Sequence, residues 1–194
     1  MRVRFVFVQD VFGMSNDSSL AIASIFGWMN LFARGLGGVL SDAMNEAMGM
    51  KGRLVIHCIL LFMEGIFVLV FGNTRTLAGA VIVLVFFSLT VQAAEGTSYG
   101  IVPYVQPPFT GSVSGIVGAG GNLGAVCFGF AFLGLAYQDA YTIMSISVII
   151  SSFLTVFIQI KGYRGLLCGD DLEVDKETGE VFDDTKLDRS QPYV

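Results

Sequence analysis

Charged residues are scarce in this sequence. Only 14% of its 194 residues are Asp, Glu, Lys or Arg, whereas 54% are hydrophobic; a soluble globular domain carries about 25% charged residues. One histidine and three scattered cysteines supply neither metal-ligand spacing nor a disulfide framework. The sequence also contains no nucleophile–base set and no phosphate-binding loop. The composition therefore favours a membrane protein, and it supports neither an enzyme nor a metal or cofactor site.

The acidic residues concentrate at the C-terminal end. After Gly169 there are nine acidic residues against three basic ones, a net charge of −6, and the remaining chain has eight basic and seven acidic residues, a net charge of +1. Residues 162–194 are therefore predicted to form an acidic, disordered tail. This charge argues against a nucleic-acid partner for the tail.

Long apolar runs occupy most of the chain. A helix needs about 20 apolar residues to cross the hydrocarbon core of a bilayer, and residues 15–161 contain five such runs. The first 14 residues include an apolar stretch too short to span, so they are interpreted as the end of a truncated transmembrane helix and an outer loop. The predicted fold is an all-α membrane protein with five full transmembrane helices and the stump of a sixth. The five predicted spans are about 19–40, 54–72, 77–103, 112–136 and 140–160.

The basic residues in the short loops predict an orientation. Lys and Arg accumulate on the cytoplasmic side of membrane proteins. If residues 41–53 are cytoplasmic, that side holds Lys51, Arg53, Lys161 and Arg164, while the opposite loops hold only Arg75. The acidic tail is then predicted to be cytoplasmic.

Three charged residues lie within the predicted spans, namely Arg34, Glu64 and Glu95. Charges in a membrane are costly and usually face a bundle interior or a water-filled cavity. Arg34 is interpreted as an anion-binding residue, because its planar guanidinium can match two oxygens of an oxyanion; the alternative is an arginine that reaches the headgroups. Glu64 and Glu95 are candidates for proton carriers, for ion-pair partners or for hydrogen-bonded packing residues.

The fourth predicted span is rich in glycine. Seven glycines and Asn122 lie between residues 111 and 129, and a spacing of four and three residues places most of the glycines on one helix face with Asn122. Small residues let helix backbones approach closely in a bilayer. An amide on such a bare surface can bond a polar ligand, or it can bond across a tight helix interface, and both can hold together.

A shorter pattern lies between the first two spans. Gly38 is followed by Asp42, and Lys51 and Arg53 open the next span. A loop of this type can join two helices through a charge pair, although a solvated loop is equally compatible with the pattern.

Four segments together resemble one family. Residues 26–34, 37–42, 94–103 and 113–126 are similar to the nitrate/nitrite porters of the major facilitator superfamily, in the eukaryotic branch of high-affinity nitrate transporters. The resemblance implies that the chain is the C-terminal part of a twelve-helix transporter. It further implies that Arg34 is one of two nitrate-binding arginines and that Gly38, Asp42 and Arg53 form the cytoplasmic latch of the superfamily. The second nitrate signature of the family corresponds to a segment that contains Gly118, Gly120, Gly121, Asn122 and Gly124.

The resemblance also implies an activity. The complete protein is expected to move nitrate, and nitrite as a further substrate, by proton-coupled alternating access at the plasma membrane. Glu95 and, after it, Glu64 are the candidate proton carriers. An N-terminal half is required to complete the path, and the need for an accessory subunit is left open. The alternatives are a transporter for another small anion and a non-transporting, membrane-embedded interaction fragment.

Overall fold

The structure is a computed structural model that describes residues 13–167. Within these residues five helices are each long and apolar enough to cross a membrane, by length and composition. One short 3-10 turn lies between the third and fourth of these helices, and a second follows the last. The five helices confirm the prediction of an all-α chain with five spanning helices. The predicted helix stump and most of the acidic tail lie outside the described residues. The helices are α2 (Asn16–Met48), α3 (Met50–Asn73), α4 (Leu77–Val105), α5 (Thr110–Gly134) and α6 (Tyr137–Leu154), with turns η1 (Pro107–Phe109) and η2 (Thr155–Phe157).

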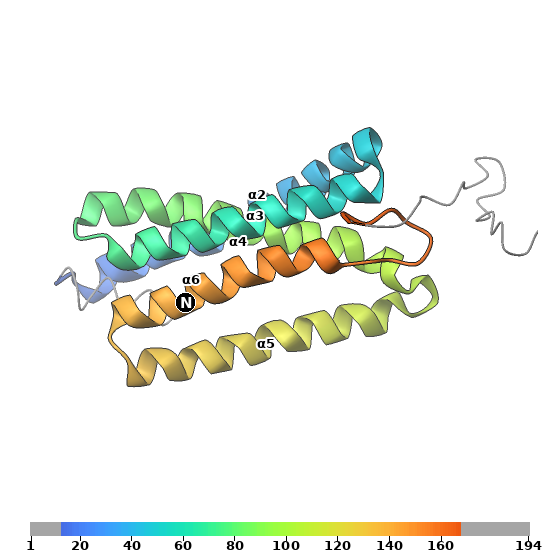
Figure 1. The fold of residues 1–194 in the computed structure, drawn as a ribbon. Helices are drawn as coiled ribbons and strands as arrows, with labels where there is room; N and C mark the ends of the chain where they lie inside the picture. Colours follow the sequence, from blue (N-terminus) through green and yellow to red (C-terminus); the bar gives the residue numbers. More distant parts are fainter. Residues whose placement is uncertain (1–12, 168–194) are drawn as a thin grey trace, which may run out of the picture.

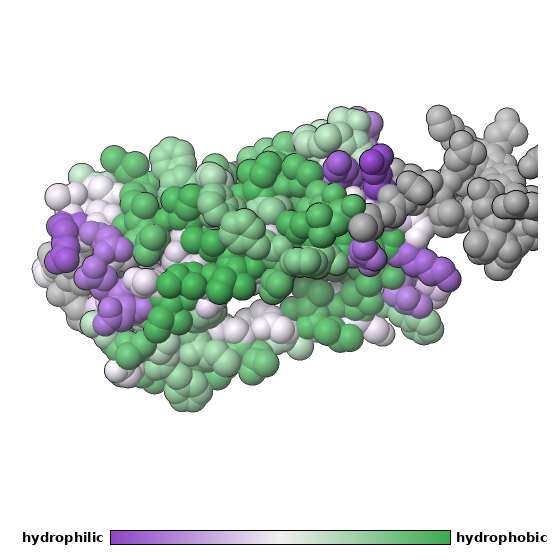
Figure 2. Space-filling model, viewed as in Figure 1, coloured by the Kyte–Doolittle hydropathy of each residue, from purple (hydrophilic) through white to green (hydrophobic). Residues whose placement is uncertain are grey.

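The surface has the pattern expected of a membrane protein. Hydrophobic residues cover the middle of the bundle, and hydrophilic residues gather at its two ends (Figure 2). Many large apolar side chains are exposed, and Leu31 on α2 and Phe130 on α5 are each more than 60% accessible. In water such an exposed belt would favour aggregation, whereas lipid or another membrane segment can cover it.

The helices do not pack equally. α2 packs mainly against α4, and α3 packs against both α4 and α6. α5 lies at the edge of the bundle beside α6 and makes few contacts with α4 and α6 (Figure 1). No residue of α5 is buried.

Two apolar clusters hold the bundle together at different levels. One joins α3, α4 and α6 through residues that include Phe71, Phe87 and Tyr141. The other joins the start of α3 to the end of α4 through Leu54 and Ile101, and the segment after α6 covers it with Ile160. Between them, α3 and α6 meet at Gly65, whose carbonyl accepts a hydrogen bond from the buried Ser145 hydroxyl at 2.8 Å. Small residues at the crossing permit this close approach.

The polar segment between the first two spans is helical rather than a loop. α2 runs to Met48, so it is 33 residues or about 50 Å long, and only Gly49 separates it from α3. Gly49 has φ of +64°, a conformation that glycine adopts without strain, and its N–H donates to the Asn45 carbonyl at 2.8 Å. Polar residues can extend a helix beyond the apolar core because water satisfies their side chains there.

Candidate functional site

Arg34 lies near the middle of α2. The helix continues from Arg34 to Met48, which is 14 residues or about 21 Å. The guanidinium of Arg34 forms an ion pair with Glu95 on α4, so in the structure Arg34 faces a neighbouring helix.

Two glycines bring the backbones of α2 and α4 together at this pair. A Cβ atom added to Gly96 would collide with the carbonyl oxygen of Arg34, and one added to Gly37 would collide with the carbonyl oxygen of Ala93. The helices can therefore cross at this distance only because neither position carries a side chain. The crossing sets the register that places Arg34 opposite Glu95.

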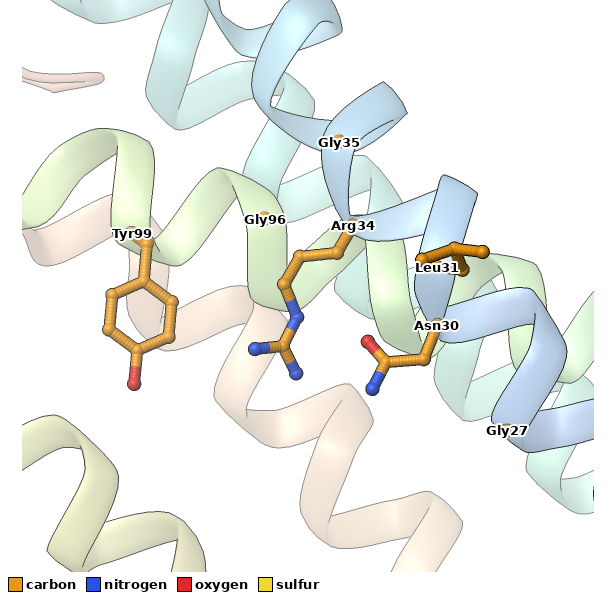
Figure 3. A pocket seen from close by; sticks show the side chains of 7 residues that line it. All are labelled: Gly27, Asn30, Leu31, Arg34, Gly35, Gly96 and Tyr99. Atoms are coloured by element: carbon orange, nitrogen blue, oxygen red, sulfur yellow. The ribbon is translucent and has the colours of Figure 1, made fainter.

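An open cavity of about 630 Å³ lies against this crossing. The side chains of Asn30, Arg34 and Tyr99 point to the same side of the two helices, and the Arg34 guanidinium lies between the other two (Figure 3). Both charged side chains keep access to the cavity or to solvent, since Arg34 is 43% and Glu95 39% exposed. The cavity is lined by Gly27, Asn30, Leu31, Arg34, Gly35, Gly96 and Tyr99.

The sequence analysis did not select Asn30 or Tyr99. A usable signal was present, because Asn30 precedes Arg34 by four residues and Tyr99 follows Glu95 by four residues. Residues four apart lie on the same helix face. Arg34 and Glu95 therefore each have a polar or aromatic neighbour one helical turn away.

The cavity has the chemistry for a small oxyanion. A guanidinium presents several N–H donors in a rigid plane, the Asn30 amide adds further donors, and the Tyr99 hydroxyl adds another. Glycines at three of the seven lining positions leave room for a ligand to approach the backbone. In the structure the charge of Arg34 is balanced by Glu95.

The glycine-rich face of α5 is not part of this cavity. Asn122 is exposed, and a Cβ added to Gly120, Gly121 or Gly124 would meet no atom within 4 Å. Only Gly118 approaches the site, since a Cβ there would lie 3.7 Å from the Tyr99 hydroxyl oxygen. Tight packing within the described residues therefore does not explain these glycines.

A second polar cluster lies at the junction of α2, α3 and α4. The Arg53 side chain is only 6% exposed and pairs with Asp42 at 2.7 Å. It also donates hydrogen bonds to the hydroxyls of Ser41 at 3.1 Å and Tyr104 at 3.3 Å, and its guanidinium lies over the Tyr104 ring, 5.1 Å from the centroid. Arg53 thus ties three helices together.

Two further predicted site residues lie apart from these contacts: Gly38, expected in the latch, and Glu64, the second candidate proton carrier. Gly38 follows the crossing glycine on α2 and is half-buried, and its backbone nitrogen lies next to Gly96. Glu64 is half-buried on α3 and does not line the cavity. The structure therefore groups Arg34 with Glu95 and not with Glu64.

The sequence is similar to characterised transporters over most of its length. It is 36% identical over 163 residues to high affinity nitrate transporter 2.5 of Arabidopsis thaliana, a match that covers 82% of this chain and 32% of the relative. It is 32% identical over 177 residues to nitrate transporter 2.2 of Chlamydomonas reinhardtii, covering 87% of this chain and 34% of the relative.

A third relative lies outside plants and algae. The chain is 32% identical to the nitrate/nitrite transporter NrtP of Picosynechococcus, over 83% of this chain and 29% of the relative. The chain is homologous to the high-affinity nitrate transporters. This relation is consistent with the C-terminal part of a nitrate/nitrite porter of the major facilitator superfamily. No family model matches the sequence, and no solved structure matches it significantly. The chain spans about a third of the length of these relatives.

Proposed function

We propose that this chain forms the C-terminal part of a transporter that carries nitrate, and nitrite as a second substrate, across a membrane by alternating access. The observation that carries the proposal is Arg34, a cation held at mid-helix in an open cavity, in a chain homologous to nitrate transporters. A midplane site at the interface between two halves is the general arrangement of such transporters.

In this proposal each candidate residue has a role. Arg34 attracts the anion and orients it, and the Asn122 amide with Gly118, Gly120, Gly121 and Gly124 borders the path where α5 meets the remainder of the protein. Support for the second role comes from the open surface of α5 in the described residues, where a Cβ added to Gly120, Gly121 or Gly124 would meet no atom within 4 Å. The chain thus contributes one wall of the path, and the N-terminal half contributes the other.

The proposed latch lies toward the C-terminal end of α2. Gly38, Asp42 and Arg53 would hold α2 and α3 together in one conformational state and release them in another. The Asp42–Arg53 pair supports this role, because Asp42 is 67% exposed while Arg53 is buried, so a moving partner can compete for the carboxylate. The number of basic residues in the short loops supports a cytoplasmic position for this end and for the acidic tail.

We further propose proton-coupled uptake at the plasma membrane. The two intramembrane carboxylates, Glu95 and Glu64, support the proton coupling, since ionisable groups in spans commonly mark proton paths. An accessory subunit is compatible with the exposed apolar surface, but no residue identifies one.

Uptake of labelled nitrate by cells expressing the full-length transporter tests the proposal. Arg34→Lys keeps the charge but loses the planar fork, so uptake should fall by at least tenfold, since a lost bidentate charge-assisted contact is worth more than about 1.4 kcal/mol. The matched control is Arg75→Lys, an exposed arginine in the opposite loop, which should leave uptake unchanged.

Three results would overturn the proposal. Nitrate uptake equal to that of the parent in Arg34→Lys would remove the site. Uptake that nitrate does not saturate, but that another small anion does, would favour the alternative substrate. Absence of any anion flux from a correctly inserted full-length protein would favour the non-transporting alternative.

A further inference from the structure

The anion site described above is already occupied by a carboxylate of the protein. Glu95 pairs directly with the Arg34 guanidinium, so an incoming anion meets a neutralised cation. This inference rests on the proposed function, and it concerns how the site becomes available to its substrate.

A neutral pair binds an anion poorly for two reasons. The negative charge of Glu95 repels an anion that the positive charge of Arg34 attracts, so the two contributions oppose each other. The carboxylate also accepts the N–H bonds that nitrate would use. Glu95 must therefore give up its charge or move away before Arg34 can bind an anion.

The other charged groups on the helices packed against α4 are not placed to replace either partner of the Arg34–Glu95 pair. Arg34 is the one basic residue of α2, and it pairs with Glu95. The carboxylate of Asp42 on the same helix pairs with Arg53. From α3, His57 bonds Thr97 at 2.7 Å, and Thr97 lies about 200° around α4 from Glu95. Glu64 on α3 has its own contact. α5, the third helix packed on α4, carries no Asp, Glu, Lys, Arg or His.

We propose that Glu95 is the proton acceptor that couples proton binding to nitrate binding at Arg34. A proton from the open side binds the Glu95 carboxylate and converts it to a neutral carboxylic acid. Arg34 stays protonated throughout and is freed to bind nitrate. After the site reopens to the other side, nitrate and the proton both leave, and the Arg34–Glu95 pair forms again. At this site one proton on Glu95 accompanies one nitrate on Arg34, so the net charge of the site is the same before and after binding.

The geometry supports this exchange. Glu95 is 39% exposed, so water can deliver a proton without a buried relay. Tyr99 and Asn30 border the same cavity as Arg34 (Figure 3), so their polar groups can contact a nitrate ion bound there. A neutral carboxylic acid can also donate a hydrogen bond to the bound anion, whereas a carboxylate cannot.

Coupling of this kind has a defined sign. Protonation of Glu95 favours nitrate binding, so by reciprocity bound nitrate favours protonation of Glu95. Nitrate affinity should therefore rise as the pH falls, by at most about tenfold per pH unit for a single coupled proton.

The test is the nitrate affinity of the purified full-length transporter at a series of pH values between about 5.5 and about 8, where the slope expected for one coupled proton is at most about tenfold per pH unit. Glu95→Gln mimics the neutral acid, so its affinity should be the same at all pH values and equal to that of the parent at low pH. Glu46→Gln is the matched control, because Glu46 is an exposed glutamate near the C-terminal end of α2 that does not line the cavity, and this variant should keep the pH dependence of the parent.

A second measurement follows the proton itself. Infrared difference spectra of the parent should show a protonated carboxyl band when nitrate binds. The band should shift in Glu95→Asp, a variant that keeps the ionisable group on a shorter arm. This measurement holds even if Glu95→Gln does not fold.

The outcomes separate this inference from the proposed function. If Glu95→Gln keeps the pH dependence of the parent, or fails to bind nitrate although it is folded, the role of Glu95 as proton acceptor is overturned. An infrared band that is unchanged in Glu95→Asp has the same meaning. In each case, if the parent binds nitrate and Arg34→Lys does not, the proposed function still stands. If the parent itself binds no nitrate at any pH, the proposed function fails.

Discussion

Replacing Gly37 with alanine should force α2 and α4 apart. The added Cβ would overlap the carbonyl group of Ala93, and every nearby atom belongs to the α4 backbone. Backbone atoms cannot rotate away as a flexible side chain can, so the helices must separate by on the order of 1 Å to restore a nonbonded contact of about 3.5–4 Å.

The magnitude follows from this overlap. Overpacking a close contact costs about 1–3 kcal/mol, and for a chain of this size each kcal/mol lowers the Tm by roughly 2–4 °C. Gly37→Ala should therefore lower the Tm by roughly 2–12 °C, although alanine favours a helix over glycine by up to about 1 kcal/mol. Thermal unfolding of the purified protein, followed by circular dichroism, measures the change.

The neighbouring glycine provides the control. A Cβ added to Gly38 meets no atom within 4 Å, so Gly38→Ala should leave the Tm unchanged or raise it slightly. The separation in Gly37→Ala should also weaken the ion pair between Arg34 and Glu95. Equal Tm values for the two variants would refute the close crossing of α2 and α4.

Two further predictions concern contacts between helices. Tyr104→Phe removes only the hydroxyl that accepts the 3.3 Å hydrogen bond from Arg53, so it should cost about 0.5–1.5 kcal/mol in unfolding free energy; Tyr104→Ala also removes the ring beneath the guanidinium and the edge contact with Tyr163, so it should cost more. An equal cost for the two variants, measured by thermal unfolding, would contradict the ring contacts. Ser145→Ala removes a buried 2.8 Å bond to the Gly65 carbonyl and should cost about 1 kcal/mol; no loss of stability in the same assay would show that α3 and α6 do not depend on this bond.

The number of helices was predictable because each apolar run matches the thickness of a bilayer. The residue at which α2 ends was not predictable. Residues 41–48 are polar enough to suggest a loop, but a helix can continue into water once its apolar part has crossed the membrane. Hydropathy marks where a helix is covered by lipid and not where its backbone hydrogen bonds stop.

Of the candidate site, only the charged residues could be predicted from the sequence. Arg34 and Glu95 are conspicuous because charge in a span is costly, but their pairing depends on the crossing of α2 and α4 at Gly37 and Gly96. The register of two helices separated by α3 cannot be read from local sequence. For the same reason the sequence did not indicate that Asn122 lies outside the cavity, on a helix with few neighbours among the described residues.

The most direct test of the central claim is whether nitrate occupies the cavity beside Arg34. Leu31 lines this cavity and is 67% exposed, so Leu31→Cys, in a full-length background without its native cysteines, should react with a water-soluble thiol reagent. Nitrate should slow this reaction in a saturable manner, and the protection should disappear when Arg34→Lys is added. Leu36→Cys, on the same helix but outside the cavity, should show no protection. A Leu31→Cys reaction rate that nitrate does not change would contradict the assignment of the site.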